Sequence, residues 1–255
     1  MGARRDALTS GAAVVALVAL WEWVSSAYVD PFFLPAPSTV LRGALELWGR
    51  GTLGGAVAAS LGRVFTGWLL GSALAIPVGL IVGSSRLAKN LVDPFIHFFR
   101  FIPAIGLLTL FMVWFGVGEE SRILLIVYST GFIVMINTAT GVAAVAQEKL
   151  DAARSLGASA RQVFFHVTIP ACVPSIYLGM RLAMASSFLV IIAAEMLAAQ
   201  SGLGSLIWSS RLYFRIDWMF TGIVLLGVLG FLTDRLWRVI GNTVLGKYVR
   251  EVGRY

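Results

Sequence analysis

The stretch D-A-A-R-S-L-G-A-S-A-R-Q-V-F-F-H-V-T-I-P, residues 151–170, is polar and rich in small residues, and it lies between two long apolar stretches. Residues 148–156 contain strong helix formers, so we predict a short amphipathic helix there. Gly157 ends or bends that helix, because glycine adopts backbone angles that other residues resist. A second short turn follows, with apolar residues at helical spacing: Val163, Phe164 and Val167. Pro170 then marks the start of an apolar helix.

The composition of the whole chain indicates that much of its surface faces lipid. The 255 residues are 58% hydrophobic and 13% charged, with a mean hydropathy of +0.85. One water-soluble core of this size cannot bury so much apolar surface. Runs near the length of about 20 residues that crosses a bilayer occur at about 10–28, 56–83, 91–115, 121–145, 171–199 and 216–240. We therefore predict an all-α membrane protein with six transmembrane helices in a single domain, residues 1–255.

The distribution of basic residues predicts the orientation of these helices. With the N-terminus inside, the inner segments hold more lysine and arginine than the outer ones. Arg100 counts toward the inner side and Arg63 and Arg122 toward the outer side, whereas Arg181 lies within a span. Because short cytoplasmic loops are enriched in basic residues, we predict that both termini and segment 148–170 lie in the cytoplasm.

Two segments near the N-terminus leave alternatives open. Arg4, Arg5 and the apolar run behind them fit a cleavable signal peptide or a first transmembrane helix. We favour a retained helix, because Trp21 and Trp23 continue the apolar run. Residues 38–48 predict an amphipathic helix on the outside, which either lies along the membrane surface or belongs to a packed external cap.

The second predicted span has a small residue at every fourth position along one helical stripe: Gly67, Gly71, Ala75, Gly79 and Gly83. In lipid, such patterns let helix backbones approach closely. We therefore predict that this helix packs tightly against a neighbour. Pro77 in the same run predicts a kink.

No motif in the sequence indicates an enzyme or a metal site. Residues 241–248 match the spacing of a phosphate-binding loop until Tyr248, which stands where Ser or Thr would hold magnesium. Cys172 is the sole cysteine, and His97 and His166 lack metal-site spacing. The net charge of +7 is spread over short loops, so we expect no nucleic-acid partner. We predict no catalytic residue, metal or cofactor in this chain.

Arg181 and Glu195 are charged residues inside a predicted span. A charge in hydrocarbon is tolerated when it is paired or faces water, so both are candidates for the transport pathway or its gate. An arginine facing a pore would favour anions. The alternative is a structural salt bridge or carbonyl contact between helices. About 21 Å of helix separates the two residues, so they are not expected to pair within one copy.

Segment 148–170 resembles the cytoplasmic "EAA" loop of permease subunits from bacterial ABC importers. The pattern of that loop is E-A-A, three residues, G-A, and an apolar turn that ends in L-P or I-P. The matching residues here are Asp151, Ala152, Ala153, Gly157, Ala158, Phe164, Val167, Ile169 and Pro170. Asp151 replaces the usual glutamate, which keeps the charge and shortens its reach.

The resemblance implies a function and a set of partners. Residues 34–38, 194–197, 202–204 and 230–235 look like the branch that imports nitrate, sulfonates and taurine, which implies a small, anionic solute. Permeases of that family have six spans and lie in the bacterial inner membrane. Each pairs with a second copy, here expected to be identical, and with two ATPase subunits that bind ATP and Mg. A periplasmic or lipid-anchored binding protein delivers the solute.

In that family, segment 148–170 is the coupling segment, and its matching residues contact the ATPase. The main rival function is a secondary transporter or channel that works without an ATPase. A membrane-bound enzyme is the rival from another class, and the missing nucleophile and metal motifs count against it.

Overall fold

The computed structural model describes residues 2–246, and this part of the chain is helical, with no strand. Residues Lys247 and Tyr248 of the loop-like motif, together with the C-terminus predicted to be cytoplasmic, lie outside the described residues. The helices in chain order are α1 (Gly2–Ala27), α2 (Pro37–Gly49), α3 (Thr52–Ser84), α4 (Arg86–Phe99), η1 (Ala104–Leu107), α5 (Leu108–Phe115), α6 (Glu119–Ala143), α7 (Gln147–Ser155), α8 (Ala160–Val163), η2 (Phe164–Thr168), α9 (Ile169–Ala198), α10 (Leu203–Leu212) and α11 (Ile216–Val244). The predicted all-α class is confirmed.

Four helices are long and apolar enough to cross a membrane: α3, α6, the continuous rod of α8, η2 and α9, and α11. The helices Arg86–Phe99 and Ala104–Phe115 are long and apolar enough only when they are taken together, and the chain bends by 85° between them. They form a fifth span only if this bent pair is counted as a single span. The apolar run 91–115, predicted as one span, is therefore not one continuous helix. Pro103 lies in the break, where its missing N–H cannot continue a helix. The apolar part of α1, Gly11–Ala27, is shorter than a span.

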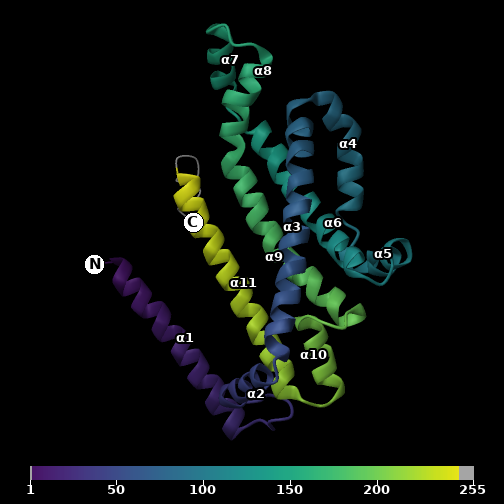
Figure 1. The fold of residues 1–255 in the computed structure, drawn as a ribbon. Helices are drawn as coiled ribbons and strands as arrows, with labels where there is room; N and C mark the ends of the chain where they lie inside the picture. Colours follow the sequence, from purple (N-terminus) through teal and green to yellow (C-terminus); the bar gives the residue numbers. More distant parts are fainter. Residues whose placement is uncertain (1, 247–255) are drawn as a thin grey trace.

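The centre of the fold is the contact between α3 and α6, which run in the same direction (Figure 1). The small-residue stripe of α3 faces α6 at very short range. A Cβ atom added at Gly67 would lie 2.6 Å from the Cβ of Ile126, and one added at Gly79 would lie 2.7 Å from the carbonyl oxygen of Met135. The predicted close helix contact is confirmed.

Helix α9 packs antiparallel to α6 and completes the central layer. The hydroxyl of Ser129 lies 2.7 Å from that of Ser186, and the hydroxyl of Thr130 lies 3.1 Å from that of Ser187. Hydroxyl pairs of this kind satisfy buried polar groups between helices in lipid. The contacts fix the register of α9 against α6.

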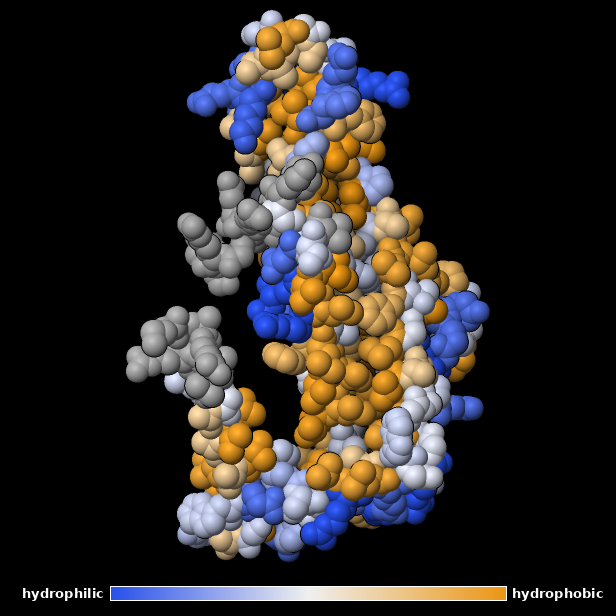
Figure 2. Space-filling view, turned by 60° about the vertical axis from the view of Figure 1, so that its left-hand side comes forward, coloured by the Kyte–Doolittle hydropathy of each residue, from blue (hydrophilic) through white to orange (hydrophobic). Residues whose placement is uncertain are grey.

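The molecule has two polar ends and an apolar middle. Figure 1 shows α7 and α8 at one end, here called the α7 end, and α2 and α10 at the opposite end, here called the α2 end. In Figure 2, hydrophobic residues cover most of the middle of the visible face, and hydrophilic residues gather mainly at the two ends. Helix α1 diverges from α11 toward its own N-terminus. This distribution fits a protein whose middle is surrounded by lipid.

Helix α2 covers the predicted amphipathic segment, and one of its faces packs on α11. Its residues Val40 and Leu47 are buried, and the Thr221 hydroxyl of α11 donates to the Val40 carbonyl at 3.0 Å. Arg215 donates to the Glu46 carboxylate at 2.6 Å, and this bond holds the pKa of Glu46 below its ordinary value. Helix α2 is therefore packed on the bundle through this face, and its other apolar residues, Leu41, Leu45 and Trp48, are exposed.

Charge counting grouped Arg100 with the basic residues of the inner side, which include those of segment 148–170. The structure does not place Arg100 beside that segment at the α7 end. It follows α4, which starts at the α7 end and runs beside α3 into the bundle. Arg100 lines a pocket together with Tyr128 and Ser129, which lie near the middle of α6. The bend of the chain after Phe99 thus carries a basic residue to mid-span depth.

Candidate functional site

Segment 148–170 contains most of α7, which ends in a Schellman motif. Gly157 has a φ of +83°, and its N–H donates to the Arg154 carbonyl at 2.9 Å. The N–H of Ala158 donates to the Ala153 carbonyl at 3.1 Å. This pair of bonds closes the C-terminus of a helix around a left-handed residue, usually glycine. The predicted glycine joint therefore has a defined geometry.

After the joint, a capping box starts α8. The Ser159 hydroxyl accepts the N–H of Gln162 at 3.3 Å, and the Gln162 side chain accepts the N–H of Ser159 at 2.8 Å. The π-helical turn η2 then joins α8 to α9 without a break, and residues Ala160–Ala198 form one rod. A displacement of α8 would thus pass directly into the bundle.

The residues predicted to contact an ATPase differ in exposure. Asp151 and Ala152 are exposed, and the Asp151 carboxylate accepts from Gln147 at 2.9 Å and Arg154 at 3.0 Å. Phe164 is half-buried and lines the groove between the segment and α3, and Pro170 is half-buried in the first turn of α9. Phe164 thus lies on the bundle side of the segment, whereas α7 presents Asp151 and Ala152 outward.

Leu156 was not among the predicted contact residues, yet it is the most prominent apolar group of the segment. Its side chain is 89% exposed at the turn beside Gly157. Burial of this side chain by a partner would remove apolar surface from water. Its place just before Gly157, at the C-terminus of α7, is the sequence feature that marks it.

Glu195 lies at the other end of the molecule and is completely buried. Its carboxylate accepts from Arg63 at 2.6 Å, from the Ser60 hydroxyl at 2.8 Å and from the Gly204 N–H at 2.9 Å. The backbone of Gly202 is also packed against it, since an added Cβ would lie 2.3 Å from the Glu195 carboxyl carbon. The carboxylate thus joins α3, α9 and the turn before α10.

Arg63 connects this carboxylate to a second one. It donates to Glu119 at 2.5 and 2.7 Å and to the Ser201 carbonyl at 2.7 Å, and Arg122 donates to the same Glu119 at 3.0 Å. Charge counting predicted that Arg63 lies on the outer side. It lies inside the predicted span 56–83, so the rule that selected Glu195 would also have selected its partner.

Arg181, the second candidate for the pathway, forms a bidentate ion pair with Asp234 of α11. The two bonds measure 2.5 and 3.0 Å, and Arg238 donates to the same carboxylate at 2.8 Å. Arg181 and Glu195 do not pair with each other, as predicted; each has its own structural partner. Arg181 joins α9 to α11, and this is the geometry of the structural alternative.

We expect Arg181→Ala and Asp234→Ala to affect stability as a pair. Both side chains are about one-third exposed, so the coupling energy in a double-mutant cycle should be about 0.5–1 kcal/mol. The measurement is unfolding of the purified chain in detergent. Strictly additive losses would contradict the pair. A loss of solute uptake that is specific to Arg181→Ala, with Asp234→Ala unaffected, would instead place Arg181 in the pathway.

Comparison with known proteins gives one consistent family. Residues 75–245 match the family described as binding-protein-dependent transport system inner membrane component. A Brucella melitensis protein named as a probable ABC transporter permease is 38% identical, with 86% of this chain and 89% of that protein covered. The taurine transport system permease protein of Escherichia coli is 34% identical, covering 91% and 86%. The nitrate import permease protein of Synechocystis is 31% identical, covering 91% and 87%.

A solved structure supports the same fold. A chain in an inward facing conformation of the MetNI methionine ABC transporter superposes with a TM-score of 0.65 at 20% identity. The match covers 74% of this chain and 95% of that chain. At this identity the likeness concerns the arrangement of helices alone.

Proposed function

The chain belongs to the family of binding-protein-dependent transport system inner membrane components, and we propose that it forms the membrane pathway of an ATP-driven importer for a small solute of the taurine, sulfonate or nitrate kind. It is a transport subunit of that family, and hydrolysis of ATP belongs to a separate partner. The observation that carries the proposal is the coupling segment, which presents α7 and Leu156 outward and continues as one rod into α9.

The proposed assembly contains two copies of this chain, two ATPase subunits and an external binding protein, periplasmic or lipid-anchored. The ATPase subunits bind ATP and Mg. In this assembly the α7 end faces the cytoplasm, as do both termini. Helix α1 and the bent pair of α4 and α5 then complete a set of six spans in the bacterial inner membrane. The apolar middle of the molecule supports this placement.

Coupling follows from the local structure of the segment. Helix α7 docks in a cleft of the ATPase, where Ala152 permits close approach and Leu156 is buried on contact. Asp151 accepts a hydrogen bond from a donor of the partner. Movement of the ATPase then displaces α7 as a rigid body, and the glycine joint and the capping box transfer it to α8 and α9. Because α9 packs on α6, the displacement reaches the centre of the bundle.

We expect Gly157→Val to lower ATP-driven uptake by about tenfold or more while the chain still inserts and folds. A β-branched residue at a positive φ strains the backbone by about 1–2 kcal/mol, which favours another path for the turn between α7 and α8. No atom lies within 4 Å of the added Cβ, so packing is not disturbed. Uptake is measured in vesicles that contain the assembled complex, and docking is measured by co-purification of the ATPase.

Gly51 offers a matched control for this variant. It has a φ of +72°, also has no atom within 4 Å of an added Cβ, and lies between α2 and α3, at the end of the molecule opposite to α7. Gly51→Val should leave ATPase binding intact. Equal losses in both variants would assign the effect to backbone strain in general. Unchanged uptake and docking in Gly157→Val would contradict the proposed coupling role.

The same assay separates the rival functions. A secondary transporter or channel would take up solute without ATP, and it would not retain an ATPase during purification. A membrane-bound enzyme would turn over a substrate as the isolated chain. ATP-dependent uptake that requires the ATPase is the outcome expected here.

A further inference from the structure

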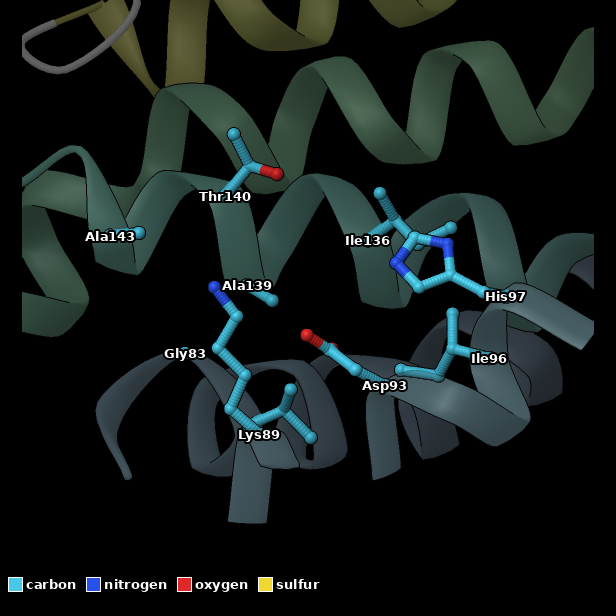
Figure 3. Close-up of a pocket in the computed structure, with 10 residues that line it drawn as sticks. Gly83, Lys89, Asp93, Ile96, His97, Ile136, Ala139, Thr140 and Ala143 are labelled. Carbon is cyan, nitrogen blue, oxygen red and sulfur yellow. The ribbon is translucent and has the colours of Figure 1, made fainter. Parts of the chain in front are cut away.

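Helix α4 presents a row of three ionisable side chains toward α6. Lys89, Asp93 and His97 are spaced by four residues, which places them on one face of the helix. They line a cavity of about 380 Å³ between α4 and α6. Figure 3 shows their side chains directed into this space, with Thr140 of α6 on the opposite wall. The cavity is within the range of about 300–1,000 Å³ that is typical of small-ligand sites.

The rest of the wall is mostly apolar. It consists of Val82, Gly83, Ile96, Ile136, Ala139 and Ala143. A few polar groups converging in an apolar pocket are the usual composition of a binding site for a small molecule. The cavity adjoins a second pocket at the α7 end, which shares Lys89 and adds Arg86 and Arg154. A basic entrance of this kind attracts anions.

The charges of this cavity have no partners in the described part of the chain. Arg63 is paired with Glu195 and Arg181 is paired with Asp234 in the long helices. In residues 2–246, by contrast, neither Lys89 nor Asp93 forms an ion pair, and their side chains make no hydrogen bond. Lys89 and His97 are exposed in the single chain and Asp93 is half-buried, so these groups are open to water or to a ligand. Unpaired groups of both signs in one pocket therefore point to a ligand with both signs.

We infer that this cavity binds a small zwitterion with an anionic group and an ammonium group, an aminosulfonate such as taurine in preference to a simple anion. Lys89 donates to the sulfonate, and His97 can donate an N–H to it in either protonation state. Asp93 accepts from the ammonium group. The inference rests on the proposed function and narrows its solute class, since the relatives include permeases for taurine and for nitrate.

Asp93 is the residue that discriminates between these solutes. A simple anion held by Lys89 leaves the Asp93 carboxylate without a partner and close to a like charge. Specificity arises when the wrong ligand leaves a polar group of the site unpaired or opposed. Taurine and ethanesulfonate differ in the ammonium group that Asp93 would bind, so they are the matched pair of probes.

The test uses the complex of this chain with its ATPase in lipid nanodiscs, without the binding protein, which would impose its own selection. Titration calorimetry measures taurine and ethanesulfonate. We expect taurine to bind about tenfold more tightly than ethanesulfonate, Asp93→Asn to remove this preference, and Lys89→Gln to weaken both probes. Asn90→Ala is the control, because Asn90 lies next to Lys89 on α4 but does not line the cavity. Equal binding of both probes, unaltered by Asp93→Asn, would overturn the inference.

A second measurement locates the ligand and does not depend on affinity. The natural Cys172 is buried, so a thiol reagent should label a His97→Cys chain at the new position. Taurine should slow this labelling about tenfold or more at saturation. Labelling that taurine does not slow would exclude the cavity as its site. If ATP-driven uptake is intact while these results are negative, the inference alone fails; if no ATPase associates with the chain, the proposed function fails.

Discussion

Glu195→Ala should destabilise the folded chain by about 3–5 kcal/mol, the range for removal of one partner from a buried ion pair. The carboxylate is fully buried and accepts from Arg63, Ser60 and the Gly204 backbone. Its loss leaves the Ser60 hydroxyl and the Gly204 N–H without this buried acceptor and removes one of the carboxylates that Arg63 binds, and it frees the turn before α10. The measurement is unfolding of the purified chain by SDS titration or by heat in detergent.

Glu120→Ala is the matched control for this variant. Glu120 is an exposed glutamate at the α2 end with no hydrogen bond to a described residue, so its removal should change stability by less than about 0.5 kcal/mol. Adding Arg63→Ala to Glu195→Ala should cost less than the sum of the two single losses, because the residues share one network. Equal stability of the two glutamate variants would contradict the structural role. Loss of transport with full stability would assign Glu195 to the pathway.

Gly79→Leu should separate α3 from α6 and destabilise the chain by about 3 kcal/mol or more, at or above the upper end for overpacking. The atom nearest to an added Cβ is the Met135 carbonyl oxygen at 2.7 Å. A backbone atom cannot rotate away as a flexible side chain would, so the whole helix must move. Because α6 also contacts α9, we expect the variant to lose folded protein in a thermal unfolding assay in detergent.

Gly62 provides the control within the same helix. It is exposed, and no atom lies within 4 Å of an added Cβ. Gly62→Leu should be neutral or slightly stabilising, because leucine favours helix over glycine by about 0.5–1 kcal/mol. If Gly79→Leu matched this control, the close contact of α3 and α6 would not limit the packing.

Several features of this protein could be predicted because their signal is local. The small-residue stripe of α3 repeats every four residues, and this period is enough to predict a closely packed face. The turn at Gly157 depends on the backbone freedom of one residue, and the predicted helix, joint and helix agree with the Schellman motif and the capping box. The family resemblance rests on residues 151–170, which are contiguous in the sequence.

The sequence did not lead us to predict the break in span 91–115, although Pro103 was a signal for it. The position of Arg100 was not predicted either. Hydropathy measures how apolar a segment is, and it does not measure its direction. An 85° bend leaves the composition of the segment unchanged. Charge counting likewise assigned Arg100 to the inner side, because it gives no depth for a residue at the end of a short helix.

By itself, the sequence determined that the chain is helical and apolar, which helix has a close-packing face, and which charges are costly inside a span. The tertiary structure alone decided the partner of each charge: Arg63 meets Glu195 across 132 residues of sequence, Arg181 meets Asp234, and Lys89 and Asp93 meet no described partner. The physical reason is that helix periodicity and glycine conformation are set by neighbours along the chain, whereas ion pairing depends on how distant helices cross. The burial of a charge can be read from its flanking residues, but the group that neutralises it is fixed when the helices pack.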